Sequence, residues 1–341
     1  MRLLLLIGMA SLIAAQATAD ERAAAAYNAS VGGVSFLVIK NGAIVYEDYP
    51  NGGRADRAWN LASGTKSFSC AIAAAAVRDG ILSLDEPAAD TLTEWRTDPL
   101  RSQVTIRQIL SLTSGLHAGP IGRAPTYSAA VETKMRADPG ESFAYGPVNF
   151  QVFGEIMRRK LARFDGGRFK DPASYLEARV LRPIGATPAA WKRGRDGQPT
   201  LPHGSEFTAR NWARYGQFAL EGGAWKGRAL VDRTSFSECF KGSAANPAYG
   251  LAWWLNREPS KDTLAASRTM TVASDLFTHP RRGEIPRDLF MAAGAGGQRL
   301  YVIPSQNLVI VRQYPRLMEP RRKVRRGESF SDVEFLLRLL D

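Results

Sequence analysis

The chain has strand-forming segments at both ends and helix-forming segments between them, and this order restricts the folds that it can adopt. Near the N-terminus, Asn41-Gly42 separates two β-rich segments, 34–40 and 43–48, which is the strongest short signal for a β-hairpin. Near the C-terminus, three short apolar segments have the pattern of an antiparallel meander: 288–293, 298–303 and 308–314. We therefore predict one antiparallel sheet built from both ends of the chain.

The middle of the chain is predicted to be mostly helical. Residues 63–79 are rich in alanine and precede Gly80, which indicates a buried helix that is apolar on nearly all sides. Ser331 begins a capping box ahead of a C-terminal helix. Four further helix starts are indicated, at Thr105, Pro147, Asp171-Pro172 and Thr208.

The predicted fold class is α/β of the α+β type, an antiparallel sheet flanked by helices with an inserted, mostly helical domain. Residues 20–90 and 271–341 are assigned to the sheet domain, and residues 91–270 to the insertion. A chain of 341 residues with 45% hydrophobic residues can bury a large core, which excludes wholesale disorder.

The first nineteen residues have the pattern of a signal peptide. Arg2 precedes an apolar run over residues 3–15, and Ala17-Thr18-Ala19 is a small-x-small cleavage motif. An uncleaved anchor is the alternative, but the apolar run is too short to span a bilayer. We predict cleavage after Ala19 and a secreted or periplasmic protein.

The chain is basic, with 45 Lys and Arg against 33 Asp and Glu and a formal charge of +12. The basic residues are scattered, and the one dense run, within residues 321–326, fits a solvated loop. We therefore expect no nucleic-acid partner, while a basic exported protein could contact an anionic cell envelope. The sequence carries no signal for an oligomeric state.

The two cysteines and three histidines form no metal-binding pattern. Cys70 and Cys239 could form one disulfide in an exported protein. Because Cys70 falls within the alanine-rich helix, we expect two unpaired, buried thiols instead. The histidines are isolated in sequence, at positions 117, 203 and 279, and none is expected near a catalytic motif.

Ser63-Gly64-Thr65-Lys66 begins the buried helix and is a candidate catalytic motif. One helical turn separates the Ser63 hydroxyl from the Lys66 amine, so the two can form a hydrogen bond. Lys66 can accept the serine proton only if burial and a neighbouring cation or dipole lower its pKa. The positive end of the helix N-terminus disfavours the ammonium and also places the Ser63 N–H where an oxyanion can form. The alternative is a capping serine followed by a surface lysine.

Two later segments could complete such a site. Tyr145 stands directly before the helix start at Pro147, where it could exchange protons with Ser63. Residues 292–298 are small and glycine-rich, so their backbone could approach a substrate closely. Taken alone, the first could equally be a core tyrosine and the second a tight turn or β-bulge.

In this order and context, the three segments resemble the penicillin-recognising serine hydrolases, in particular the class C β-lactamase and esterase branch. The resemblance extends over most of the chain. Its other segments are residues 41–42, 60–66, 80–85, 106–116, 207–216 and 296–304.

The resemblance implies an acyl-enzyme reaction on a small ester, amide or peptide-like substrate, without a metal or organic cofactor. Ser63 would be the nucleophile, Lys66 would help to deprotonate it, and Tyr145 would serve as partner base and acid. The oxyanion hole would comprise the N–H groups of Ser63 and of Ala295, the residue after Gly294.

The chain departs from the family at the positions that hold a β-lactam. The Tyr-x-Asn motif appears as Tyr145-Gly146-Pro147, and Asn149 is out of register and expected to point elsewhere. The Lys-Thr-Gly motif appears as residues 292–294, Ala-Ala-Gly, which lack the cation that anchors a carboxylate. The pattern is closer to the family's esterases and 6-aminohexanoate-oligomer hydrolases. The alternatives are a class C-like β-lactamase, a D-Ala-D-Ala peptidase, or a sensor that is acylated once without turnover.

Overall fold

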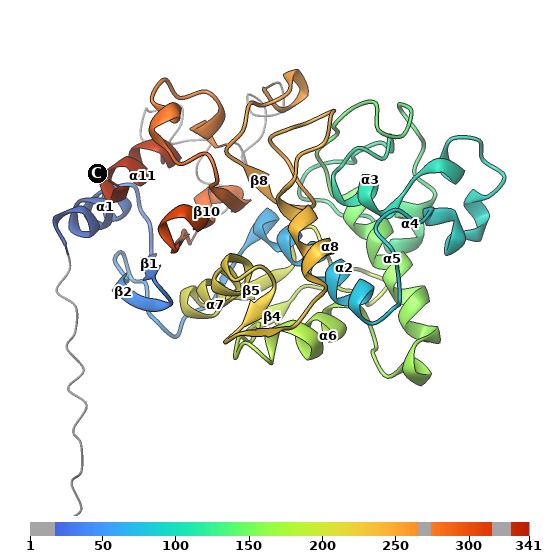
Figure 1. The fold of residues 1–341 in the computed structure, drawn as a ribbon, viewed down its shortest axis with the longest axis horizontal. Coiled ribbons are helices and arrows are strands. Elements are labelled where there is room, and N and C mark those ends of the chain that lie inside the picture. The colour runs from blue at the N-terminus through green and yellow to red at the C-terminus, as the bar shows by residue number, and fades with distance from the viewer. Residues whose placement is uncertain (1–17, 265–273, 316–328, 341) are drawn as a thin grey trace, which may run out of the picture.

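The computed structural model describes residues 18–264, 274–315 and 329–340. Its largest sheet has six antiparallel strands in the order β2-β1-β11-β10-β9-β8 (Figure 1). Their bounds are β1 Ser35–Lys40, β2 Ala43–Asp48, β8 Trp254–Leu255, β9 Phe290–Gly294, β10 Gln298–Ile303 and β11 Leu308–Gln313. The N-terminal strand β1 pairs with the C-terminal strand β11, so the prediction of a sheet built from both ends is confirmed.

The β1–β2 hairpin turns at the two residues that predicted it. Asn41 and Gly42 have φ values of 52° and 79°, and Lys40 pairs with Ala43. Positive φ at both central residues is the requirement of a type I′ turn, which asparagine and glycine meet at low cost. The predicted hairpin is therefore confirmed.

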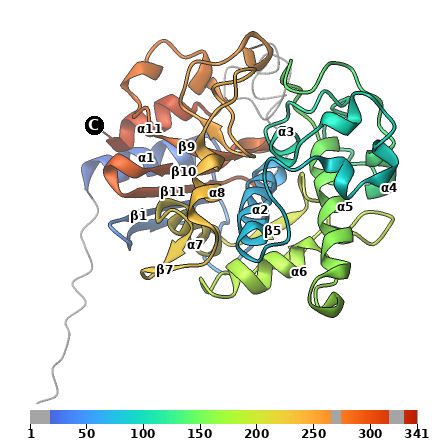
Figure 2. The ribbon, with the colours of Figure 1, turned by 45° about the vertical axis from the view of Figure 1, so that its right-hand side comes forward.

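Helices cover both faces of this sheet (Figures 1 and 2). Helices α1 (Ala19–Ser30) and α11 (Asp332–Leu340) lie together on one face, where Phe335 packs against Phe36 with ring centroids 5.2 Å apart. Helix α7 (Ala209–Leu220) covers the other face. A Cβ on Gly216 of α7 would come within 2.5 Å of Val309, so glycine lets this helix approach the sheet closely.

The segment between the sheet strands is mostly helical, as predicted. Thr105, Asp171 and Thr208 accept hydrogen bonds from the first turns of the helices that they were predicted to start, and α5 begins directly after Pro147. The remaining helices are α2 Phe68–Arg78, α3 Ile106–Leu110, α4 Tyr127–Val131, α5 Val148–Arg163, α6 Pro172–Leu176 and α8 Arg233–Ser237.

Short strands also occur in this middle segment. β3 (Trp59–Asn60), β5 (Ser205–Phe207) and β4 (Ala190–Trp191) form a three-stranded sheet, and β6 (Ala224–Trp225) and β7 (Arg228–Ala229) form a hairpin. Strand β8 also comes from the segment assigned to the insertion, yet it pairs with β9 of the large sheet.

The expectation of two free thiols is wrong, because Cys70 and Cys239 form a disulfide with their Cα atoms 6.0 Å apart. Cys70 lies on α2, and Cys239 lies in a short 3-10 turn, Glu238–Phe240, that follows α8. Helix α8 packs against α2 and so brings residues 169 positions apart in sequence into contact. Sequence spacing alone does not show this packing.

The ends of the described chain bear on two further predictions. Thr18 caps α1 in a capping box with Glu21, whereas most of the predicted signal peptide and the basic run at 321–326 lie outside the described residues. Ser331 Oγ accepts from the N–H of Glu334 as predicted, but its own N–H donates to the Tyr27 hydroxyl instead of to Glu334. Among the described helices, none is long and apolar enough to cross a membrane.

Candidate active site

Ser63 and Lys66 lie side by side in a 3-10 turn, Ala62–Ser67, that leads into α2. Lys66 Nζ donates to Ser63 Oγ at 3.0 Å and to the Pro202 carbonyl at 2.8 Å. Lys66 is 4% exposed, so the alternative of a surface lysine is wrong. The backbone before Ser63 is strained, because Ala62 has a φ of 47°, and Asn60 Oδ1 accepts from the Ala62 N–H.

Burial lowers the pKa of Lys66 far enough for its amine to act as a base at neutral pH. Its pKa falls from 10.5 to about 7, because the buried site disfavours the ammonium ion. Its Nζ lies over two aromatic rings, 4.9 Å from the ring centroid of Tyr145 and 5.6 Å from that of Phe150. A substantial fraction of Lys66 is therefore neutral near pH 7 and able to accept a proton.

Tyr145 reaches the same site from the loop before α5. Its hydroxyl is buried without a hydrogen-bond partner among the described residues. Burial raises the pKa of Tyr145, while the nearby Ser63 hydroxyl acts in the opposite direction. Tyr145 is therefore a protonated phenol at neutral pH, able to donate its proton to a group that binds beside Ser63.

The end of β9 lies against the turn that carries Ser63. A Cβ on Gly294 would come within 2.1 Å of the Leu61 carbonyl and 3.1 Å of the Gly64 nitrogen, so only glycine fits at this contact. Ala295, the next residue, begins a 3-10 turn, Ala295–Gly297. The structure thus brings the two predicted oxyanion-hole segments together.

Strand β8 covers only part of the outer edge of β9. It pairs with Phe290 and Met291, and Ala292, Ala293 and Gly294 extend beyond it towards Ser63. Among the described strands, none pairs with this part of the edge. Ala292 and Ala293 are each 2% exposed, and the Gly294 carbonyl accepts from Arg299 Nη1 at 2.9 Å, so this end of β9 is buried beside Ser63.

An aromatic wall, which sequence reasoning missed, adjoins Tyr145. Trp254 stacks on Tyr145 with centroids 5.4 Å apart, and Tyr249 and Phe277 contact Trp254 at 4.7 Å and 5.4 Å. Phe143 contacts Tyr249 at 5.2 Å. The density of aromatic residues over 249–254 is the signal that could have indicated it. The Tyr249 hydroxyl is buried without a partner among the described residues.

The expectation that no histidine lies near a catalytic motif is wrong, because His203 lies beside Lys66. Strand β5 pairs with β3, which directly precedes the Ser63 turn, and this pairing places Pro202 and His203 at the site. Burial, and then the charge of Lys66, lower the pKa of His203 to about 4, so the imidazole is neutral. Its Nε2 atom is buried without a partner among the described residues.

Asn149 and Arg299 do not replace the two missing lactam-binding features. Asn149 is 1% exposed and accepts a hydrogen bond from Ser114 Oγ at 2.5 Å. Arg299 acts electrostatically on Tyr145, but it is buried and bound to Asp332 at 2.6 Å. Neither side chain is therefore placed to hold a substrate carboxylate or amide.

Comparison with known proteins identifies the family. The β-lactamase family model matches residues 16–324, so the chain belongs to the β-lactamase family, within the penicillin-recognising serine hydrolases. The fold is similar to that of a protein from Bacillus anthracis named as a candidate 6-aminohexanoate-dimer hydrolase, with a TM-score of 0.66 and 19% identity over 89% of this chain and 79% of that one.

Two further structures share this fold. A family VIII carboxylesterase has a TM-score of 0.63 and 16% identity over 87% of this chain and 91% of the esterase. A penicillin-binding protein homologue from Caulobacter crescentus has a TM-score of 0.62 and 17% identity over 89% and 95% of the two chains. At these identities the likeness concerns the fold, and the reaction must be argued from the site.

Proposed function

We propose that this protein is a serine hydrolase that cleaves an ester or amide through an acyl-enzyme on Ser63. The observation that carries the proposal is the 3.0 Å hydrogen bond between Lys66 Nζ and Ser63 Oγ, made by a lysine whose burial lowers its pKa to about 7. A serine with an adjacent base of matched pKa is the requirement for nucleophilic catalysis.

The proposed reaction has two half-reactions. Neutral Lys66 takes the Ser63 proton, Oγ attacks the substrate carbonyl carbon, and the N–H groups of Ser63 and Ala295 stabilise the oxyanion. Tyr145 donates its proton to the leaving oxygen or nitrogen and regains one from the Lys66 ammonium. Neutral Lys66 then takes a proton from water as the water oxygen attacks the acyl carbon, and this proton passes to Ser63 Oγ as the acid leaves.

The surroundings of the site favour a substrate without a carboxylate beside the scissile bond. Ala292 and Ala293 stand where a lactamase has its cationic motif, and Arg299 is held by Asp332. The buried rings of Tyr249, Trp254 and Phe277 make the surroundings of Tyr145 apolar, which favours an apolar acyl or alcohol group. We therefore place an esterase or amidase ahead of a β-lactamase or a D-Ala-D-Ala peptidase. A sensor that is acylated without turnover is the remaining alternative.

The test is intact-mass spectrometry after treatment with a fluorophosphonate, together with assays on p-nitrophenyl acetate and nitrocefin. We expect one adduct on Ser63, turnover of the ester and slow or absent nitrocefin hydrolysis. Ser63→Ala should remove both the adduct and the turnover while leaving the melting temperature nearly unchanged. Ester hydrolysis by Ser63→Ala would refute the proposal, and an adduct without ester turnover would favour the sensor.

We also propose that the protein is exported, as secreted or periplasmic enzyme. The support is the sequence pattern of residues 1–19. N-terminal sequencing of protein recovered outside the cytoplasm is expected to begin at Asp20. Recovery of the intact N-terminus from the cytoplasm would contradict export.

A further inference from the structure

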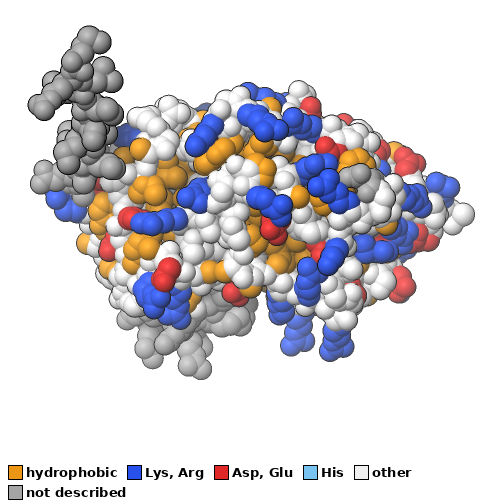
Figure 3. Space-filling model, turned by 90° about the horizontal axis from the view of Figure 1, so that it is seen from below, with side chains coloured by type: hydrophobic (Ala, Val, Ile, Leu, Met, Phe, Trp, Pro, Cys, Tyr) orange, Lys and Arg blue, Asp and Glu red, His pale blue; other side chains and the backbone are white. Residues whose placement is uncertain are grey.

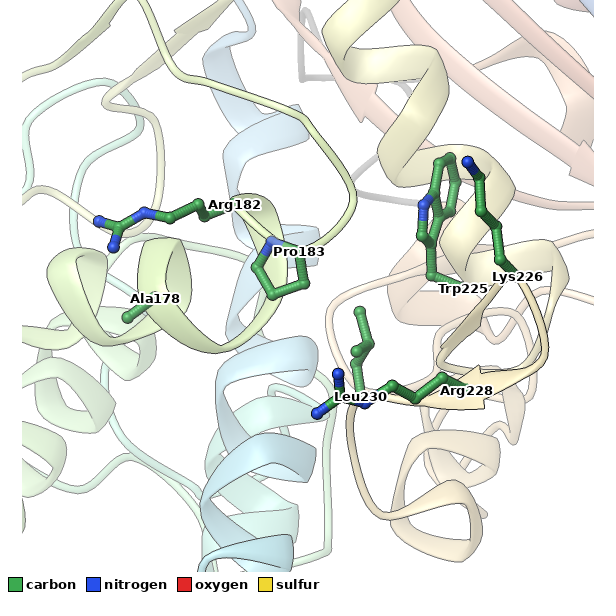
Figure 4. Close-up of a pocket in the computed structure, with 7 residues that line it drawn as sticks. All are labelled: Ala178, Arg182, Pro183, Trp225, Lys226, Arg228 and Leu230. Carbon is green, nitrogen blue, oxygen red and sulfur yellow. The ribbon is translucent and has the colours of Figure 1, made fainter.

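A groove remote in sequence from the Ser63 motif lies between the helical turn that follows α6 and the β6–β7 hairpin (Figure 4). It has a volume of about 530 Å³. Its lining contains three cations and one large aromatic ring, without an acidic side chain: Ala178, Arg182, Pro183, Trp225, Lys226, Arg228 and Leu230.

The two walls present different groups to the space between them. Figure 4 shows the Trp225 indole standing beside Lys226 on one wall, while Arg228 extends towards the opposite wall, where Pro183 lies. Arg182 extends away from the opposite wall in Figure 4 and pairs with Glu177 at 3.6 Å. Neither Lys226 nor Arg228 forms an ion pair with a described residue, so both charges are available to a ligand.

Both walls contain uncommon backbone conformations. Lys226 has a φ of 49° and precedes Gly227 at 79°, so it occupies a type I′ position that asparagine or glycine fills at lower cost. The Lys226 N–H donates to Glu221 Oε2 at 3.2 Å, which holds the turn from behind. On the other wall, residues Glu177–Leu181 form a π-helical turn, a feature frequent at functional sites. The strained turn holds Lys226 next to Trp225 at the groove.

We infer that this groove binds an anionic saccharide, a sugar ring that carries a carboxylate or phosphate. The apolar face of a pyranose ring can pack on the Trp225 indole, and Arg228 and Lys226 can bind the anion. Figure 3 shows Lys and Arg side chains spread over the face seen from below, with Asp and Glu side chains among them. The proposed export favours an envelope saccharide over a nucleotide.

The test is isothermal titration calorimetry of the full chain with a galacturonic acid trimer. Maltotriose is the neutral-sugar control, and AMP is the control for an anion that stacks on an aromatic ring. Lys226→Asn with Arg228→Gln removes both charges, and asparagine suits the turn. The matched control, Lys40→Gln with Arg123→Gln, removes two exposed cations elsewhere. Equal melting temperatures establish that all three proteins are folded.

We expect the trimer to bind at least about tenfold more weakly to the groove variant and within about twofold of wild type to the control. Maltotriose and AMP should bind at least about tenfold more weakly than the trimer to the wild type. Equal losses in the two variants would show diffuse charge attraction and overturn the proposal. Tighter binding of AMP, or no binding of the trimer at millimolar concentration, would also overturn it. Hydrolysis of p-nitrophenyl acetate should be unchanged in both variants. A failed groove proposal can therefore be told apart from a failed proposal of the hydrolase reaction.

Discussion

At the scale of the residue, burial changes what Lys66 and His203 can do. Both side chains lie at the Ser63 site, and burial lowers the pKa of each, that of Lys66 to about 7 and that of His203 to about 4. At pH 7 a histidine with this pKa stays neutral, whereas Lys66 exchanges protons readily. The lysine, and not the histidine, is therefore suited to cycle its proton during a reaction near neutral pH.

The first prediction concerns the pH dependence of acylation. Because only the neutral amine accepts a proton, the kcat/KM for p-nitrophenyl acetate should rise through an apparent pKa of about 7 and level off above it. Lys66→Arg keeps the positive charge but cannot supply a neutral amine, so its rate should fall about 10²-fold or more. Stopped-flow rates from pH 5 to 9 would check both. A wild-type profile that is flat across this range would rule out Lys66 as the base.

At the scale of the element, the backbone of strand β9 lies directly against the backbone of the Ser63 turn. The contact at Gly294 leaves no room for a side chain, and the two preceding residues are buried alanines. The small residues over 292–298 predict a close backbone approach, but an ordinary tight turn has the same composition. The pairing of β9 with β10 and β8 decides that Gly294 approaches the backbone of the Ser63 turn.

The second prediction tests this approach with a single methyl group. Gly294→Ala places a Cβ 2.1 Å from the Leu61 carbonyl, so the end of β9 must move away from Ser63. Loss of one oxyanion donor costs about 10²–10³ in rate, and overpacking costs about 1–3 kcal/mol of stability. The measurements are ester turnover and urea unfolding.

Gly283→Ala is the matched control, because a Cβ at Gly283 would meet no atom within 4 Å. It should leave the rate and the stability nearly unchanged. Equal activity of the two alanine variants would show that the end of β9 takes no part in the reaction.

At the scale of the whole molecule, contacts between distant segments hold the site together. Strand β1 pairs with β11, β3 pairs with β5, and the disulfide joins α2 to the turn after α8. Cys239 also lies shortly before residues 249–254, which form part of the aromatic wall. The disulfide therefore connects the helix that follows Ser63 to the segment that carries Tyr249 and Trp254.

The third prediction concerns this disulfide. Because it closes a long loop, its removal should lower the free energy of unfolding by about 2–5 kcal/mol. Unfolding in urea with and without dithiothreitol would measure the effect in the wild type. The Cys70→Ala, Cys239→Ala double variant should unfold at the midpoint of the reduced protein and be insensitive to the reductant. The same midpoint for oxidised and reduced wild type would contradict a stabilising disulfide.

Local signals determined the elements of this protein. The Asn41-Gly42 turn, the caps at Thr105 and Thr208 and the start of α5 after Pro147 each depend on residues within a few positions of one another, so the sequence alone predicts them. The hydrogen bond between Ser63 and Lys66 belongs to the same class, since one helical turn sets its geometry.

Tertiary structure decided the features that join distant residues. The aromatic residues over 249–254 are visible in the sequence, but the partner of Cys70, the place of His203 beside Lys66 and the packing of Trp254 on Tyr145 depend on how strands and helices pack. The pKa of Lys66 combines both levels. Sequence placed the amine one turn from Ser63, but the surrounding core excludes the water that would otherwise keep it charged.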